Sequence, residues 1–142
     1  MPSRHRAAYG KRMGLPSGLT ASITLKVCEG DTALAMESGD VPVLATPRLV
    51  AWLEAATVEC LTTTLGPGST SVGTRVEVEH VAPSPVGAAV VTRASVSYVD
   101  GRLVRFEVAA EHRVGGADPV VVATGRVTRV VVDRERFLAR LR

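Results

Sequence analysis

The chain has 142 residues, of which 46% are hydrophobic and 22% are charged, a composition typical of one compact domain with a hydrophobic core. Its apolar runs, such as those at 120–123 and 130–132, are far shorter than the roughly 20 residues that a membrane helix needs, so we expect no membrane partner. The net charge of +3 comes from residues 1–18, which hold four basic and no acidic side chains. Without them 13 basic residues face 14 acidic ones, and this balance disfavours a nucleic-acid partner.

The first eighteen residues also lack the apolar core of a secretory signal. We predict a disordered basic leader over 1–18 and a single domain over 19–142. The two cysteines, Cys28 and Cys60, do not have the spacing of metal ligands. We expect both to be buried, reduced thiols, which indicates a cytoplasmic protein.

Alternation of apolar and polar residues predicts a strand over 19–27, because the residues at 21, 23, 25 and 27 are all apolar and share one face. A weaker element at 32–37 follows. The Ser-Gly-Asp-Val-Pro segment at 38–42 then interrupts regular structure.

A long helix is predicted from Thr46 to about residue 65. Thr46 can serve as its N-cap, Pro47 suits the first helical position, and the Gly-Pro-Gly segment at 66–68 ends it. Besides its main apolar face, the helix has further apolar residues on its remaining surface: Ala51, Ala55 and Val58. We therefore expect protein to enclose the helix on most sides.

Everything after the helix has the pattern of β-structure. The expected strands are 74–81, 86–99, 103–113 and 119–132, and the Asp-Gly pair at 100–101 is a strong hairpin signal between the middle two. A long helix followed by an antiparallel meander predicts an α+β protein of the hot-dog type, in which a curved sheet wraps a long central helix. Such a sheet has open edges, and pairing of these edges in a homodimer would cover them.

Glu54 is the first candidate catalytic residue. It lies on the flank of the apolar helix face, beside Val50 and Leu61, and no cation is close in the sequence. Its negative charge would then be stabilised by a group distant in the sequence, which is typical of a functional site. The alternative is an ordinary helix glutamate that reaches water.

His80 and Thr46 are the other two candidates. His80 shares a strand face with Val76 and Val78, so its imidazole, which titrates near neutral pH, should point inward. It could also be a hydrogen-bonded core histidine without a catalytic role. Thr46 is explained by its place at the helix start, although helix N-termini also favour a developing oxyanion. The remaining histidines, His5 and His112, receive no role.

Other functional motifs are missing from the sequence. It contains no GxSxG elbow, Walker loop, dinucleotide fingerprint or histidine and cysteine cluster, so we expect no metal and no cofactor.

Gly73 would permit close approach of the backbone to a ligand. Arg129 shares its strand phase with Val127 and Val131, which is unusual for a surface charge.

Several of these segments together resemble the hot-dog thioesterases typified by the fluoroacetyl-CoA-specific thioesterase family. They are Ala45-Thr46-Pro47, Trp52-Leu53-Glu54-Ala55-Ala56, Ser71-Val72-Gly73-Thr74, Glu79-His80, Gly125 and Thr128-Arg129-Val130. Glu54 follows Thr46 by eight positions and His80 follows Glu54 by twenty-six, as in the threonine, glutamate and histidine triad of that family. The similarity extends over roughly residues 19–136.

The resemblance implies hydrolysis of a small or medium acyl-CoA to free acid and CoA, at a site near a dimer interface. Thr46 would polarise the thioester, Glu54 would act as base or nucleophile, and His80 would orient groups and relay a proton. The resemblance also implies that Gly73 and Arg129 lie near the substrate.

An aromatic gate precedes the threonine in the fluoroacetyl-CoA enzyme, whereas residues 37–45 contain no aromatic residue, so we do not expect selectivity for fluoroacetyl-CoA. The main alternative function is a non-catalytic module that binds acyl-CoA. A hot-dog dehydratase ranks last, because it would need an aspartate and a histidine in one short helical motif and the predicted helix contains no histidine.

Overall fold

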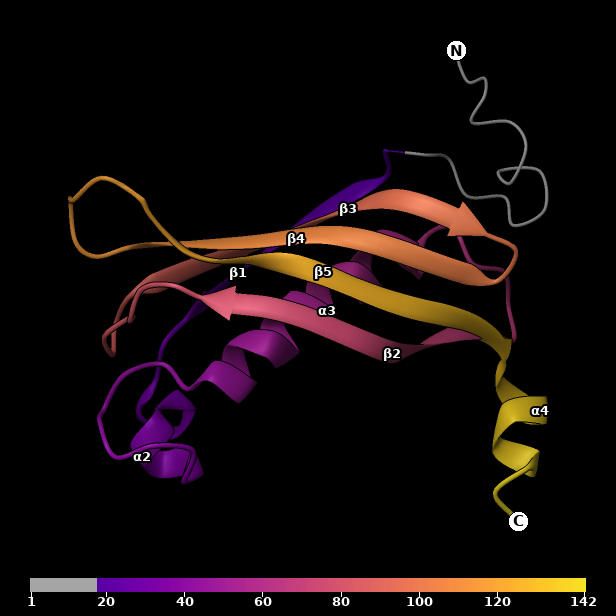
Figure 1. Ribbon diagram of the computed structural model, residues 1–142, viewed down its shortest axis with the longest axis horizontal. Helices are drawn as coiled ribbons and strands as arrows, with labels where there is room; N and C mark the ends of the chain where they lie inside the picture. The colour runs from indigo at the N-terminus through magenta and orange to yellow at the C-terminus, as the bar shows by residue number, and fades with distance from the viewer. Residues whose placement is uncertain (1–17) are drawn as a thin grey trace.

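The computed structural model describes residues 18–142 (Figure 1). The predicted leader, apart from Gly18, therefore lies outside the described residues. Within residues 18–142, no helix is long and apolar enough to cross a membrane.

A long helix and five strands dominate the fold. The first half of the chain forms β1 (Thr20–Lys26), the short 3-10 helix η1 (Glu29–Asp31), α2 (Ala33–Met36) and the long helix α3 (Thr46–Thr62). The second half forms β2 (Ser69–His80), β3 (Ala89–Asp100), β4 (Leu103–Arg113), β5 (Val120–Asp133) and the C-terminal helix α4 (Arg134–Ala139). All predicted strands are present, but β2 begins five residues earlier than expected, because the polar segment 69–73 pairs with β5.

The strands form one antiparallel sheet in the order β1-β3-β4-β5-β2. The sheet curves over α3, as Figure 1 shows. This arrangement is the predicted α+β architecture, with a long central helix wrapped by an antiparallel sheet. β1 and β2 are the two edge strands, so one side of β2 has no strand partner within the described chain.

The core lies between α3 and the sheet. Leu49, Leu53 and Ala56 of α3 are fully buried there, as is Phe106 of β4. The opposite side of the helix differs from our expectation of near-complete enclosure, because Ala51 and Val58 are exposed, Val58 by 44%. Residues 18–142 of a single chain thus leave part of the apolar helix surface uncovered.

The two cysteines lie in different environments. The Cys60 thiol is buried and donates to the backbone carbonyl of Ala94 at 3.4 Å. Burial raises its pKa to about 11, and the Glu59 carboxylate adds to the rise. Cys28 is exposed in the turn after β1, so the prediction that both thiols are buried was wrong for Cys28. Its position between β1 and η1 lies outside the core.

Gly125 is required by the close approach of β5 to β2. A Cβ built at this position would lie 2.8 Å from the Cα of Val78 and would also clash with the Glu77 carbonyl. Because both contacts are with backbone, Gly125→Ala should lower the free energy of unfolding by about 1–3 kcal/mol in chemical denaturation. Gly116→Ala, whose Cβ would meet nothing within 4 Å, is the matched control. Equal stability of the two variants would contradict this assignment.

Candidate active site

Thr46 does not cap α3, contrary to the prediction. The N-cap residue is Ala45, which makes no side-chain capping bond, and Thr46 is the first helical residue, followed by Pro47. The Thr46 hydroxyl instead contacts His80, with 2.7 Å between Oγ1 and Nδ1. Its role at the helix start therefore does not account for the hydroxyl.

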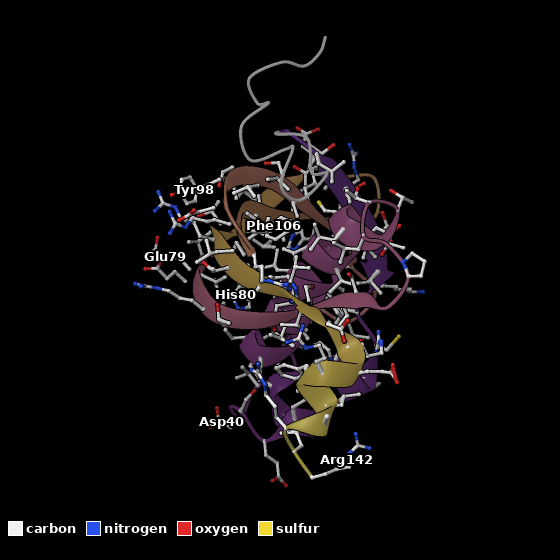
Figure 2. All side chains as sticks on the ribbon, turned by 90° about the vertical axis from the view of Figure 1, so that its right-hand side faces the viewer. Asp40, Glu79, His80, Tyr98, Phe106 and Arg142 are labelled. Atoms are coloured by element: carbon white, nitrogen blue, oxygen red, sulfur yellow. The ribbon has the colours of Figure 1, made fainter. Side chains whose placement is uncertain are left out.

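His80 is the last residue of β2 and pairs with Ala123 of β5. Figure 2 shows its side chain directed toward the interior, whereas the neighbouring Glu79 projects outward. Its Nε2 is buried and makes no hydrogen bond with any described residue. Burial lowers the pKa of His80, and the backbone of Ala82 offsets part of this effect. The imidazole is therefore neutral at neutral pH and able to accept a proton.

Glu54 has the distant cation that its sequence position indicated. Its Oε2 lies 3.6 Å from Nη1 of Arg129, and the side chains are 34% and 9% exposed respectively. Arg129 is held by Ser71, because its Nε donates to the Ser71 hydroxyl at 2.8 Å and its Nη2 donates to the Ser71 carbonyl at 3.2 Å. Burial lowers the pKa of Arg129, while the charge of Glu54 acts in the opposite direction. Glu54 is thus not an isolated glutamate that reaches only water.

Gly73 provides the space in which the Glu54 carboxylate lies. A Cβ at Gly73 would be 2.6 Å from Glu54 Oε2 and 3.4 Å from Arg129 Nη1. The close approach expected of this glycine is therefore to a side chain of the candidate site. Ser71, which lies before the strand predicted at 74–81, belongs to the same group of residues. Its place two positions before Gly73 on the same strand face was the available signal.

The predicted site residues form two half-sites within one chain. The first, the Thr46 half-site, consists of Thr46 and His80. The second, the Glu54 half-site, consists of Glu54, Ser71, Gly73 and Arg129. Glu54 follows Thr46 by eight positions along the helix, which is a rise of about 12 Å, so the chain does not bring all three predicted catalytic side chains into contact.

A cavity of about 370 Å³ adjoins the Thr46 half-site. Small side chains form most of its wall, including Ala33, Gly39, Val43, Ala82 and Pro83. No phenylalanine, tyrosine or tryptophan of the described chain, residues 18–142, lines it, which agrees with the lack of aromatic residues at 37–45. Across residues 18–142, no group of three or more histidine, cysteine, aspartate or glutamate side chains could hold a metal ion.

His112, to which the sequence assigned no role, supports the segment that precedes Thr46. Its Nδ1 lies 2.6 Å from the hydroxyl of Ser84, and both residues are buried. The Ser84 carbonyl accepts a hydrogen bond from the backbone N–H of Leu44 at 2.9 Å. Ser84 is fully buried, so substrate cannot reach its hydroxyl, and we interpret this pair as structural.

Comparison with known proteins identifies the family. The family described as fluoroacetyl-CoA-specific thioesterase (FlK) matches residues 27–135, most of the chain. The chain belongs to the FlK family. A relative in this family is the fluoroacetyl-CoA thioesterase of Streptantibioticus cattleyicolor, 34% identical over 100 residues that cover 70% of this chain and 68% of the relative. The resemblance seen in the sequence is thereby confirmed.

Solved structures of similar proteins confirm the hot-dog fold. The structure of the fluoroacetyl-CoA thioesterase FlK has 28% sequence identity and a TM-score of 0.80, over 90% of this chain and 96% of that one. A thioesterase superfamily member from Thermus thermophilus has 26% identity and a TM-score of 0.80, over 89% and 90% of the two chains. A hot-dog-like protein from Thermanaerovibrio acidaminovorans has 27% identity and a TM-score of 0.80, over 94% of each chain. This member of the FlK family is accordingly a hot-dog thioester hydrolase.

Proposed function

We propose that the protein hydrolyses a small or medium acyl-CoA to the free acid and CoA, with Thr46, Glu54 and His80 as its catalytic residues. The observation that carries this proposal is the 2.7 Å contact between the Thr46 hydroxyl and His80 at the start of α3. The hydroxyl is not engaged in helix capping, and the imidazole beside it is neutral and has an Nε2 without a hydrogen-bond partner in the described part of the chain. These are properties of a site for general acid–base catalysis.

Thr46 and the helix start would bind the thioester carbonyl. The first amides of an α-helix lack partners within the helix, and together with the helix dipole they favour an oxygen on which negative charge develops. The Thr46 hydroxyl lies at this end of α3 and is exposed to the adjoining cavity. His80 would then relay to the departing CoA thiolate a proton that comes from water, and would itself be neutral again at the end of the reaction.

Glu54 would act in one of two ways. As a base, its carboxylate removes a proton from water, whose oxygen attacks the carbonyl carbon. As a nucleophile, the carboxylate oxygen attacks the same carbon and forms a mixed anhydride, which water then hydrolyses. In both routes the carbon–sulfur bond breaks and the products are the acid and CoA. Arg129 would stabilise the negative charge of the carboxylate before attack.

A homodimer would complete this site. The outer side of β2 has no strand partner among residues 18–142, and Ala51, Val58 and Val76 expose apolar surface on the neighbouring helix and strand. β2 runs from the Glu54 half-site to His80, so antiparallel pairing of β2 with its copy would place the Thr46 half-site of one subunit beside the Glu54 half-site of the other. The active site would then draw on both subunits.

We further propose a cytoplasmic enzyme whose catalytic domain comprises residues 19–142. The free thiol of Cys28 supports this location, because an exposed cysteine stays reduced most readily in a reducing compartment. The expected partners are the acyl-CoA substrate and a second copy of the chain.

Thiol release from a panel of acyl-CoAs tests the proposed function. We expect acetyl-CoA and short branched or aromatic acyl-CoAs to be hydrolysed at rates comparable to or above that of fluoroacetyl-CoA, because neither residues 37–45 nor the cavity contain an aromatic gate. A strong preference for fluoroacetyl-CoA over acetyl-CoA would contradict this selectivity. If CoA thioesters bind but none is hydrolysed, the non-catalytic binding module is the better account.

A further inference from the structure

A groove of about 370 Å³ lies between α4 and the end of the sheet, outside both half-sites. It is lined by Arg102 of the β3–β4 turn and by residues 130–133 at the end of β5. Arg136 and Phe137 of α4 and its C-cap, Arg140, complete the lining. Figure 1 shows α4 at the end of β5, away from α2. The groove thus combines three guanidinium groups with one aromatic ring.

The positive charge of the groove is largely unneutralised. Among residues 18–142, Asp133 is the one acidic residue that lines the groove, and the Asp133 carboxylate already accepts the backbone N–H of Arg136 at 2.9 Å as the cap of α4. No ion pair within residues 18–142 involves the Arg136 or Arg140 side chains. Arg102 is held in place by a hydrogen bond from Nη1 to the Val131 carbonyl at 3.3 Å. Such a site favours a ligand with several negative charges.

We propose that this groove binds the phosphorylated adenosine end of CoA, an inference that rests on the proposed function. Guanidinium groups form paired hydrogen bonds with phosphate oxygens, and the CoA nucleotide carries a diphosphate and a 3′-phosphate. The half-buried ring of Phe137 offers a face on which adenine can stack. Charge and aromatic surface therefore match the two parts of this ligand.

The position of the groove agrees with a substrate that crosses the dimer. Asp133 pairs with Ser69 at the start of β2, whereas His80 lies at its end. Within one chain the groove and the Thr46 half-site are therefore at opposite ends of the sheet. In the proposed antiparallel pairing, the groove of one subunit would lie at the same end as the Thr46 half-site of the other. The nucleotide of one CoA thioester could then occupy the groove of one subunit while its acyl group occupies the Thr46 half-site of the other.

The test compares the double variant Arg136→Ala/Arg140→Ala with Arg93→Ala/Arg126→Ala, which removes two charges from exposed arginines paired with Glu111 and Glu107. The groove variant should raise the Kd for CoA and the KM for acyl-CoA about tenfold, the effect of losing one charged hydrogen bond. Its kcat and its KM for the matching acyl-pantetheine, which has no nucleotide, should not change. The control pair should leave all four values unchanged.

Several outcomes would overturn the proposal. One is an equal KM for acyl-CoA in the groove variant and the control. Another is an equal rise, in the groove variant, of the KM for acyl-CoA and the KM for acyl-pantetheine. A third is loss of the dimer of the groove variant in light scattering, which would make the groove a subunit contact. Calorimetric titration with CoA needs no turnover, so it tests the groove even if no thioester is hydrolysed, and it separates failure of this inference from failure of the proposed function.

Discussion

Glu54→Gln and His80→Ala should each lower kcat for the best acyl-CoA by at least ~100-fold, the lower range for positioned acid–base groups. The glutamine keeps the size of the side chain but can neither take a proton from water nor attack the carbonyl carbon. The alanine removes the imidazole that contacts Thr46 at 2.7 Å. Steady-state thiol release, with circular dichroism to confirm folding, measures the effect.

The double variant Glu54→Gln/His80→Ala should lose little more than either single one, because groups that act as one unit have non-additive effects. Glu59→Gln is the matched control, since Glu59 is an exposed glutamate of the same helix. It should hydrolyse acyl-CoA at the wild-type rate. If Glu54→Gln is folded and also hydrolyses acyl-CoA at the wild-type rate, Glu54 has no catalytic role and the non-catalytic acyl-CoA-binding module becomes the better account.

Gly73→Ala should lower kcat on the order of 100-fold, the scale for a misplacement of about 1 Å at a reacting group. The added methyl group would lie 2.6 Å from Glu54 Oε2, so the carboxylate must move away from its place beside Arg129. The protein should stay folded and close to wild-type stability, because the displaced atom is the end of a flexible side chain. Kinetics and thermal unfolding together measure this separation of activity from stability.

Gly66→Ala is the control for this variant, because its added Cβ would meet nothing within 4 Å. Both proteins should unfold at similar temperatures, and only Gly73→Ala should lose activity. Wild-type kcat in Gly73→Ala would show that the position of the Glu54 carboxylate does not matter for turnover.

Periodicity was sufficient to predict most of the architecture. The alternation through Val78 and His80 gave the correct inward face of β2, and the Asp-Gly pair at 100–101 correctly marked the hairpin between β3 and β4. Arg129, whose strand phase with Val127 and Val131 was unusual for a surface charge, is buried in the structure. These features are local, because they depend on residues a few positions apart.

The contacts of the site depend on chain segments far apart, which is why the sequence could indicate them only in outline. The lack of a local cation beside Glu54 implied a distant partner, but nothing in the sequence identified the bond between Arg129 and Ser71. Thr46 was assigned to the N-cap because threonine favours the N-cap and proline favours the position after it. In the structure Ala45 is the N-cap, so the helix begins one residue earlier than predicted. The helix α4 has six residues, too few for a periodic signal.

Mixing Glu54→Gln subunits with His80→Ala subunits tests the central claim, a thioesterase site completed by a second copy of the chain. After subunit exchange at equal amounts, about half of the dimers should contain one subunit of each kind. Each such dimer would have one site with an intact His80 from one subunit and an intact Glu54 from the other, so thiol release from acyl-CoA should recover to about a quarter of the wild-type rate. If mass spectrometry shows that mixed dimers have formed but activity stays at the level of the two inactive parents, the site does not combine residues of both subunits and the account is contradicted.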